Sequence, residues 1–189
     1  MGSEDRSEVL FIGGAAGVGK STVALEVSHL LEQAEVRHAV TEGDNLDLAY
    51  PAPWRSGPML AERNLAAMWR NYRDAGYSCL IYTNTVSVLE MKSLEEAMGG
   101  NVRGMGVLLT GDDATRHARL AVREVGSGLE IHIERSDRAA RELASKAGSG
   151  IRRVRTDGRS VTELARELVE FTGWCSGHRP PGEADAARR

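Results

Sequence analysis

One segment near the start of the chain constrains its fold more than any other. Residues 14–21 match the pattern G-x-x-x-x-G-K-[ST], after a short apolar run at residues 9–12 and before a stretch with helical spacing of apolar residues. A glycine-rich loop between a buried strand and a helix turns its backbone N–H groups inward, where the helix N-terminus adds positive potential. The motif and its setting therefore predict a phosphate-binding loop on an α/β scaffold.

Each position of this loop has an expected role in holding a nucleotide. Lys20 is expected to contact the β- and γ-phosphates, and the hydroxyl of Ser21 is expected to bind Mg²⁺. The alternative, a glycine-rich turn without a ligand, is disfavoured because the motif and its strand–helix setting agree. No N-K-x-D sequence for guanine recognition occurs, so ATP and Mg²⁺ are the expected cofactors. The nucleotide-binding candidates of this segment are Gly14, Ala15, Ala16, Gly17, Val18, Gly19, Lys20, Ser21 and Thr22.

The length and composition of the chain indicate one α/β domain. The chain has 189 residues, of which 41% are hydrophobic and 27% are charged, and its net charge is −3. This charge gives no reason to expect nucleic-acid binding, and no apolar stretch approaches the roughly 18 residues typical of a membrane span. The two cysteines form no metal-binding pattern, and the polar N-terminus lacks the features of a signal peptide. We therefore expect a cytoplasmic protein, either a monomer or a homodimer.

Apolar runs alternate with helical patterns along the whole chain. A parallel sheet with right-handed crossovers and helices on both faces is expected, and its ligands should bind at the carboxyl ends of the strands. The domain is expected to span residues 8–173, with residues 1–7 and 176–189 as flexible termini. Strands are expected at about residues 8–12, 38–42, 79–83, 104–110 and 151–155. Helices are expected after the phosphate-binding loop and at about residues 58–75, 87–98, 113–124, 129–147 and 160–172.

A carboxylate candidate lies at the end of the second expected strand, in the run Glu42-Gly43-Asp44. Beside the phosphate-binding loop, Asp44 would face the γ-phosphate, where it could accept a proton from a substrate hydroxyl or hold Mg²⁺. The alternative is a turn-forming aspartate after Gly43. Glu42 is a weaker candidate, because strand alternation is expected to turn it away from the side of Asp44.

These features together resemble the small P-loop phosphotransferases, which include gluconate kinase, shikimate kinase, adenylyl-sulfate kinase and chloramphenicol phosphotransferase. The resemblance rests on the phosphate-binding loop, on Asp44, on the arginines after the fourth strand and on Thr156-Asp157-Gly158 after the fifth. It implies a P-loop NTPase fold of three layers, α/β/α, with a five-stranded parallel sheet and a helical lid at about residues 113–130. The substrate motifs of shikimate kinase and adenylyl-sulfate kinase are absent, so neither substrate is expected.

The resemblance also implies roles for residues outside the phosphate-binding loop. Lid arginines are implied to contact the phosphates, and Arg116, Arg119 and Arg123 are spaced so that one helix face presents all three. Arg123, next to the Gly-Ser-Gly sequence at 126–128, is the first candidate and Arg119 the second, although a solvated helix face is an equal alternative for any one of them. The turn at 156–158 is implied to lie under the adenine ring, and a tight turn that needs its glycine is the alternative.

The acceptor candidates are fewer and come from three segments. Tyr50 and Trp54 belong to a proline-rich loop after Asp44, which could line a substrate pocket or cover the core. Arg63 lies on a helix face that could hold an anionic group of the acceptor; the alternative is that this face is solvated. Asn84, at the end of the third strand, is a polar group expected at the same site. Arginines in the pocket would favour an anionic acceptor, whereas the aromatic loop, which is favoured slightly, would suit a neutral and partly apolar one.

The sequence therefore predicts an ATP- and Mg²⁺-dependent phosphotransferase that moves the γ-phosphoryl group to a hydroxyl of a small molecule. Two alternatives remain at this point, a nucleotide-binding regulatory ATPase and a nucleoside monophosphate kinase. The absence of D-x-x-G and of an acid at the end of the third strand disfavours the first. The catalytic candidates are Lys20, Asp44, Arg119 and Arg123, and the Mg²⁺ candidates are Ser21 and Asp44.

Overall fold

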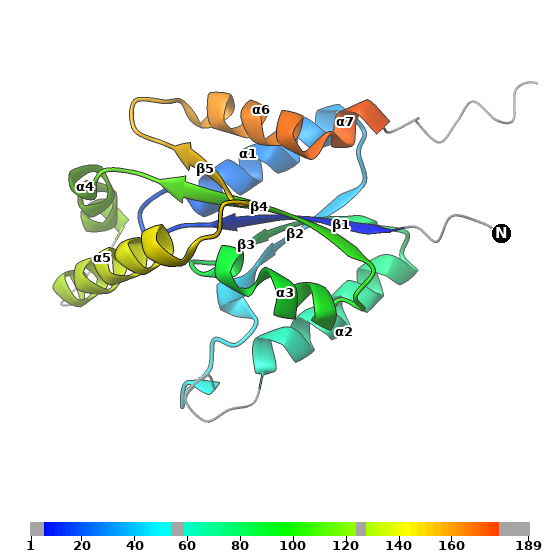
Figure 1. Cartoon of the computed structure of the whole chain (residues 1–189), viewed down its shortest axis with the longest axis horizontal. Coiled ribbons are helices and arrows are strands. Elements are labelled where there is room, and N and C mark those ends of the chain that lie inside the picture. Colours follow the sequence, from blue (N-terminus) through cyan, green and yellow to red (C-terminus); the bar gives the residue numbers. More distant parts are fainter. Residues whose placement is uncertain (1–5, 54–58, 124–127, 178–189) are drawn as a thin grey trace, which may run out of the picture.

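The computed structural model describes residues 6–53, 59–123 and 128–177, and a five-stranded sheet lies at its centre (Figure 1). All strand pairs are parallel, and the strand order is β2-β3-β1-β4-β5. This arrangement confirms the expected five-stranded parallel sheet. The strands are β1 (Ser7–Gly13), β2 (His38–Glu42), β3 (Cys79–Thr83), β4 (Val102–Thr110) and β5 (Arg152–Arg155).

Helices cover both faces of the sheet and form the three-layer α/β/α arrangement that was expected. In Figure 1, α1, α6 and α7 lie on one face, and α2, α3 and α5 lie on the other. None of the helices in the described ranges is both long and apolar enough to cross a membrane. The helices are α1 (Lys20–Gln33), α2 (Leu60–Asp74), α3 (Ser87–Ala97), α4 (Asp113–Arg123), α5 (Leu129–Lys146), α6 (Val161–Thr172) and α7 (Trp174–Gly177).

Alternating side chains of the central strand β1 supply the core on both faces. Leu10 and Ile12 point toward α1 and α6, whereas Val9 and Phe11 point toward α2 and α3. All four side chains are fully buried. A strand that is apolar on both faces belongs in the middle of a parallel sheet, with a helical layer on each side. Because helices pack on both faces of β1, the strand is held firmly, and so is the start of the loop that follows it.

Three residues of the segments expected to be flexible termini, Ser7, Ser176 and Gly177, belong to regular elements. Ser7 is the first residue of β1, where its N–H donates to the carbonyl of Asn101 (3.2 Å). Ser176 lies in α7, which begins with the buried Trp174 of the core. The rest of the expected flexible termini, residues 1–5 and 178–189, lies outside the described residues.

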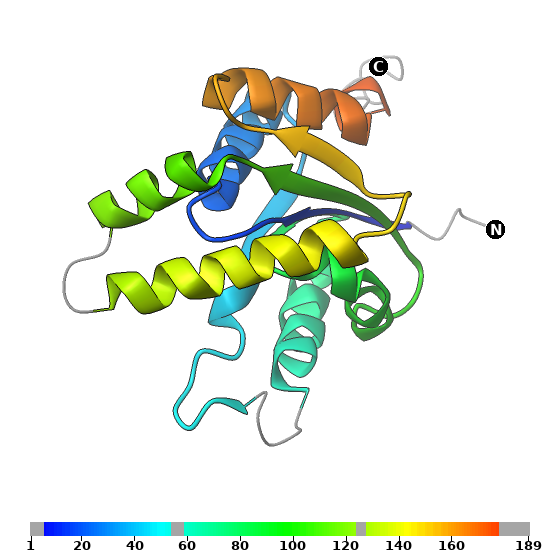
Figure 2. The same cartoon turned by 60° about the vertical axis from the view of Figure 1, so that its left-hand side comes forward.

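The carboxyl ends of the strands bring the candidate site together. The phosphate-binding loop follows β1, a 3₁₀ turn at Gly43–Asn45 follows β2, and Asn84 follows β3 at the same edge. Helices α4 and α5 pack against each other beside this edge (Figure 2). Helix α4 and the first two residues of α5 lie in the segment 113–130 that was expected to form a helical lid, although residues 124–127 of that segment lie outside the described residues.

Candidate active site

The phosphate-binding loop has the backbone that an anion site needs. Gly14, Gly17 and Gly19 have φ values of 147°, 80° and 100°, which are left-handed conformations that favour glycine. A Cβ at Gly17 would also lie 2.5 Å from the carbonyl oxygen of Arg116. Helix α1 starts at Lys20, and within the described residues no side chain caps it and no acidic residue lies in its first turn. Its N-terminal N–H groups and positive potential therefore remain available to phosphate.

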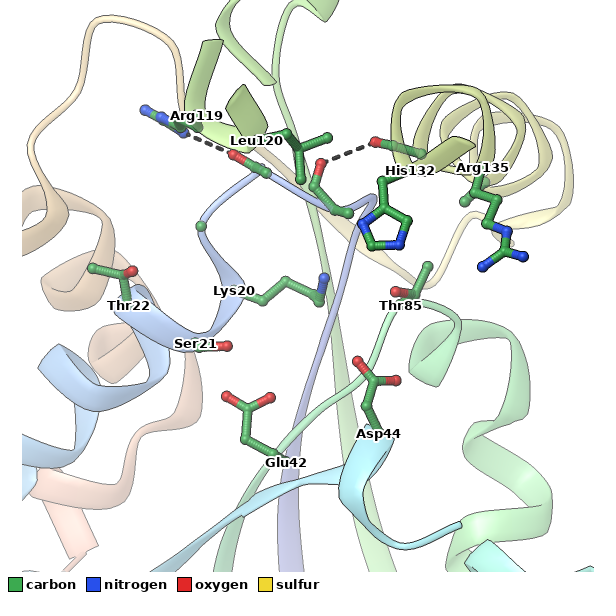
Figure 3. Close-up of a pocket in the computed structure, with 15 residues that line it drawn as sticks. Lys20, Ser21, Thr22, Glu42, Asp44, Thr85, Arg119, Leu120, His132 and Arg135 are labelled. Carbon is green, nitrogen blue, oxygen red and sulfur yellow. Dashed lines mark hydrogen bonds between the residues drawn. The ribbon is translucent and has the colours of Figure 1, made fainter. Parts of the chain in front are cut away.

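A cavity of about 540 Å³, the loop cavity, opens above this loop (Figure 3). Lys20, Arg119, His132 and Arg135 supply its basic side chains, and Glu42 and Asp44 supply carboxylates. The ammonium of Lys20 donates to the carbonyl of Gly14 (2.9 Å). The full described lining is Ala16, Gly17, Gly19, Lys20, Ser21, Thr22, Glu42, Asp44, Thr85, Arg119, Leu120, His132, Arg135, Ser136 and Ala139.

Both carboxylates at the end of β2 face the loop cavity, so the expectation that Glu42 turns away was wrong. Strand alternation stops at Glu42, because the 3₁₀ turn that begins at Gly43 redirects the chain. Thr83 donates to Glu42 Oε2 and Asn84 donates to Asp44 Oδ1, each over 2.8 Å, and these bonds orient the carboxylates. Ser21 lines the same cavity, so a hydroxyl and two carboxylates offer the hard oxygen ligands that suit Mg²⁺.

Of the three arginines expected on one lid face, the structure brings one to the loop cavity. Arg119 lines it and donates long hydrogen bonds to the carbonyls of Gly17 (3.5 Å) and Val18 (3.3 Å). Arg116 is buried instead, which corrects the idea that one helix face presents all three to the phosphates. The side chain of Arg123 is outside the described residues, so its role stays a prediction.

The buried guanidinium of Arg116 ties α4 to α5. It donates to Asp113 (2.6 Å) and Asp137 (2.8 Å) and to the hydroxyl of Ser136. Hydrogen bonds from His117 and then from Arg116 hold the pKa of Asp137 below its usual value. The Ser136 hydroxyl in turn donates to the carbonyl of Ala16 in the phosphate-binding loop (2.9 Å). Arg116 therefore helps to position α5 over the loop.

Helix α5 supplies cavity residues that sequence reasoning missed. His132 and Arg135 point from this helix into the loop cavity (Figure 3), and Ser136 and Ala139 line it as well. Their spacing of i, i+3, i+4 and i+7 places all four on one helix face. This helical spacing, in the segment after the expected lid, was the signal from which the sequence could have identified these cavity residues.

The turn expected to contact adenine lines neither of the two cavities described for this edge of the sheet. Asp157 accepts hydrogen bonds from the N–H of Asp112 (3.0 and 3.1 Å) and pairs with Arg155 (3.0 Å), so it fastens the turn to the start of α4. Gly158 has a φ of 70°, which fits the tight turn that was the alternative. The hydroxyl of Thr156 is buried and has no partner among the described residues. An adenine-binding role for 156–158 stays a prediction.

A second cavity of about 650 Å³ adjoins the loop cavity and shares Asp44 and Thr85 with it. We call it the carboxylate cavity, after four of its lining residues, Asp44, Asp47, Glu62 and Glu90. Asn84 lies in its wall, as the sequence suggested for an acceptor site. The other described lining residues are Leu48, Met59, Leu60, Ala61, Tyr82, Thr85, Val86 and Leu94.

The structure does not bring two other acceptor candidates, Tyr50 and Arg63, to this cavity. The side chain of Tyr50 is 99% exposed, and neither Tyr50 nor Arg63 lines either cavity. Successive residues of a helix point about 100° apart, so the face of α2 that directs Glu62 inward leaves Arg63 exposed. Trp54 lies outside the described residues.

The sheet order and the phosphate-binding loop are those of a P-loop fold, which solved structures of small P-loop kinases share. A structure of a tunicamycin resistance protein from Deinococcus radiodurans is similar, with a TM-score of 0.59, 17% identity, and coverage of 89% of this chain and 96% of that one. An APS kinase from Mycobacterium tuberculosis in complex with AMPPNP and APS is similar with a TM-score of 0.55 and 19% identity, and the match covers 88% of this chain and 97% of that one. A gluconokinase from Sinorhizobium meliloti has a TM-score of 0.54 and 16% identity, and the match covers 93% of this chain and 100% of that one.

No family model matches the chain, and no curated protein sequence matches it either. At the identities of the solved structures, the similarity is one of fold. It confirms the expected P-loop architecture over most of the chain.

We predict that Gly43→Ala destabilises the domain. A Cβ at this position would overlap the Tyr82 hydroxyl and ring, which are held in a packed core, so the 3₁₀ turn or the ring must move. Overpacking of this kind costs about 1–3 kcal/mol and should lower the midpoint of chemical unfolding. Gly148→Ala is the matched control, because a Cβ there meets nothing within 4 Å. Equal midpoints for the two variants would contradict the close contact between Gly43 and Tyr82.

We also predict that Ser136→Ala loosens α4 and α5 from the phosphate-binding loop. The variant removes the hydroxyl that joins Arg116 to Ala16 and takes one acceptor from a buried guanidinium, a loss of about 1–3 kcal/mol. Amide hydrogen exchange of α4 and of the first half of α5 should therefore become faster. Ser145→Ala on the same helix is the control, since that hydroxyl donates within α5 to the Glu142 carbonyl and bonds to no other described element. Identical exchange in both variants would rule out the bridging role.

Proposed function

We propose that the protein is a phosphotransferase that uses ATP and Mg²⁺ to phosphorylate a hydroxyl of a small molecule. The observation that carries the proposal is the junction of the two cavities at Asp44. A γ-phosphate held by the phosphate-binding loop would lie beside a second cavity whose 650 Å³ suits a small molecule. The fold shared with an APS kinase and a gluconokinase supports the same class of reaction.

The loop cavity has the charge pattern that a bound nucleotide requires. Backbone N–H groups at the start of α1 and the Lys20 ammonium would hold the β- and γ-phosphates. Arg119, which lies against the loop, and Arg135 of α5 also line the cavity and would stabilise the negative charge on the γ-phosphoryl oxygens. Such a site works by positioning and charge stabilisation and needs no covalent nucleophile.

The two carboxylates are proposed to have different roles. Glu42 lies on the Ser21 side of the loop cavity and Asp44 on the Thr85 side (Figure 3). Ser21, with Glu42 and Asp44 directly or through water, would hold Mg²⁺, which when bound neutralises charge on the phosphates. Asp44, oriented by Asn84, would also accept the proton of the acceptor hydroxyl.

Two features of the carboxylate cavity disfavour the alternative functions. A regulatory ATPase has no need of a second cavity that opens on the γ-phosphate position. A nucleoside monophosphate kinase would need cationic side chains for the phosphate of its acceptor. No lysine or arginine is among the described residues that line the carboxylate cavity.

Lys20→Ala is expected to weaken Mg·AMPPNP binding about 10–100-fold, because it removes a charge-assisted contact worth about 1.5–3 kcal/mol. Titration calorimetry measures the affinity, and circular dichroism checks that the variant is folded. Lys146→Ala is the control, since that ammonium is exposed and pairs with Glu142 on the far part of α5. Wild-type affinity in a folded Lys20→Ala protein would refute the role of the loop.

Asp44→Asn should lower turnover roughly 10²–10⁴-fold, because the amide keeps the shape but accepts no proton. Nucleotide affinity should change little, because Ser21 and Glu42 would still hold Mg²⁺ and the amide oxygen of Asn can still accept a hydrogen bond from Mg²⁺-bound water. The assay is acceptor-dependent ADP release, with the acceptor first found in pooled hydroxylated metabolites and antibiotics. Asp74→Asn at the exposed end of α2 serves as the control. Near-normal turnover of Asp44→Asn would remove this carboxylate from the mechanism.

A further inference from the structure

The two adjoining cavities carry opposite charge. The loop cavity has three lysine or arginine side chains, Lys20, Arg119 and Arg135. The carboxylate cavity has Asp44, Asp47, Glu62 and Glu90, and no lysine, arginine or histidine among its described lining residues. The described wall of the carboxylate cavity is therefore negative up to the proposed γ-phosphate position.

A buried tyrosine lies in the same cavity wall as these carboxylates. Tyr82 is only 2% exposed, its ring centroid lies 5.7 Å from that of Phe11 in an edge-on arrangement, and its hydroxyl has no hydrogen-bond partner among the described residues. Burial, and then the charges of Glu90 and Asp44, raise the pKa of Tyr82 far above its ordinary value. An uncharged phenol in a cavity wall can form a hydrogen bond with a ligand, and here it would break no bond to a described residue to do so.

Three of the four carboxylates in this cavity have no described cationic partner. No described lysine or arginine pairs with Asp47, Glu62 or Glu90. Burial of its carboxyl group, and then repulsion by Glu62 and the neighbouring aspartates, raise the pKa of Glu90. Like charges held together destabilise the folded state, and a cationic ligand would relieve that repulsion.

The arrangement favours an organic cation over a metal ion. No three histidine, cysteine, aspartate or glutamate side chains in the described ranges are placed to hold one metal ion. The carboxylates instead belong to different elements, with Glu62 on α2, Glu90 on α3 and Asp47 after the 3₁₀ turn. Leu48, Met59 and Leu94 add apolar contacts between them. Dispersed charges on a partly apolar wall suit ammonium groups carried on a carbon skeleton.

We propose that the acceptor is a hydroxylated amine, such as an amino sugar or an amino alcohol, with its ammonium groups bound by Glu62, Glu90 and the Tyr82 hydroxyl. This proposal rests on the proposed function. The acceptor hydroxyl lies at Asp44; its oxygen forms the bond to the γ-phosphorus as the bond to the β–γ bridging oxygen breaks. ADP leaves with that electron pair, and Asp44 takes the hydroxyl proton.

The test compares probes that differ in charge but share a skeleton. Glucosamine, glucose and gluconate form one set, and a panel of amino sugars, aminocyclitols and amino alcohols with their neutral and carboxylate analogues extends it. Calorimetry measures their binding to the protein saturated with Mg·AMPPNP, and ADP release is measured with Mg·ATP. At least one amine should bind roughly tenfold or more tightly than its neutral analogue, since each charge-assisted contact contributes about that factor.

The two readouts separate this proposal from the proposed function. A neutral or anionic compound that binds best, or an absence of preference for amines across the panel, overturns the hydroxylated-amine acceptor. Phosphorylation of such a neutral or anionic compound would leave the phosphotransferase itself standing. Tight binding of an amine without ADP release would support the cationic ligand site and contradict the phosphotransferase.

Variants locate the site within the protein. Glu62→Gln and Glu90→Gln should each weaken binding of the best amine roughly tenfold, with Mg·AMPPNP affinity unchanged. Tyr82→Phe, which keeps the buried ring, should weaken it as well. Glu96→Gln is the matched control on α3, because Glu96 is exposed and pairs with Lys92 on the helix surface. Unchanged amine affinity in both glutamine variants, with thermal unfolding confirming that they fold, would overturn the assignment.

Discussion

The candidate site depends first on the close contact between the phosphate-binding loop and the two helices that lie over it. Gly17 approaches the backbone of Arg116 so closely that only glycine fits, and Ser136 donates to the Ala16 carbonyl. Arg116, buried between α4 and α5, donates to Ser136 and Asp137. These bonds hold α5 at the distance from which the Ser136 hydroxyl can bond to the loop. The same packing contacts therefore determine two things. They fix the loop conformation that would bind phosphate, and they place the basic side chains over the loop.

The second constraint is the contrast in charge across Asp44. Phosphate groups need the cations of the loop cavity, whereas the carboxylate cavity disfavours any ligand that carries a negative charge there. This contrast separates the two proposed substrates by electrostatics as well as by shape. An acceptor held by arginines, which the sequence left open, gains no support from the described lining of the carboxylate cavity, because none of those residues is an arginine.

The parts of this account that could be predicted from sequence are those set by local rules. The phosphate-binding loop follows from its motif, and Asp44 and Asn84 follow from their places after parallel strands, whose carboxyl ends meet at one edge. What could not be predicted depends on packing between distant segments. Helical spacing places Arg116 and Arg119 on one face but does not say that α5 buries the first. Glu62 and Glu90 become neighbours only because α2 packs on α3.

The most direct test of the central claim is a crystal structure of the protein with Mg²⁺ and AMPPNP. The account predicts that the triphosphate lies in the loop cavity, with Mg²⁺ near Ser21 and the γ-phosphate between Lys20 and Asp44, facing the carboxylate cavity. A nucleotide bound elsewhere would contradict the account. A γ-phosphate in the loop cavity that points away from Asp44 and the carboxylate cavity would contradict it as well.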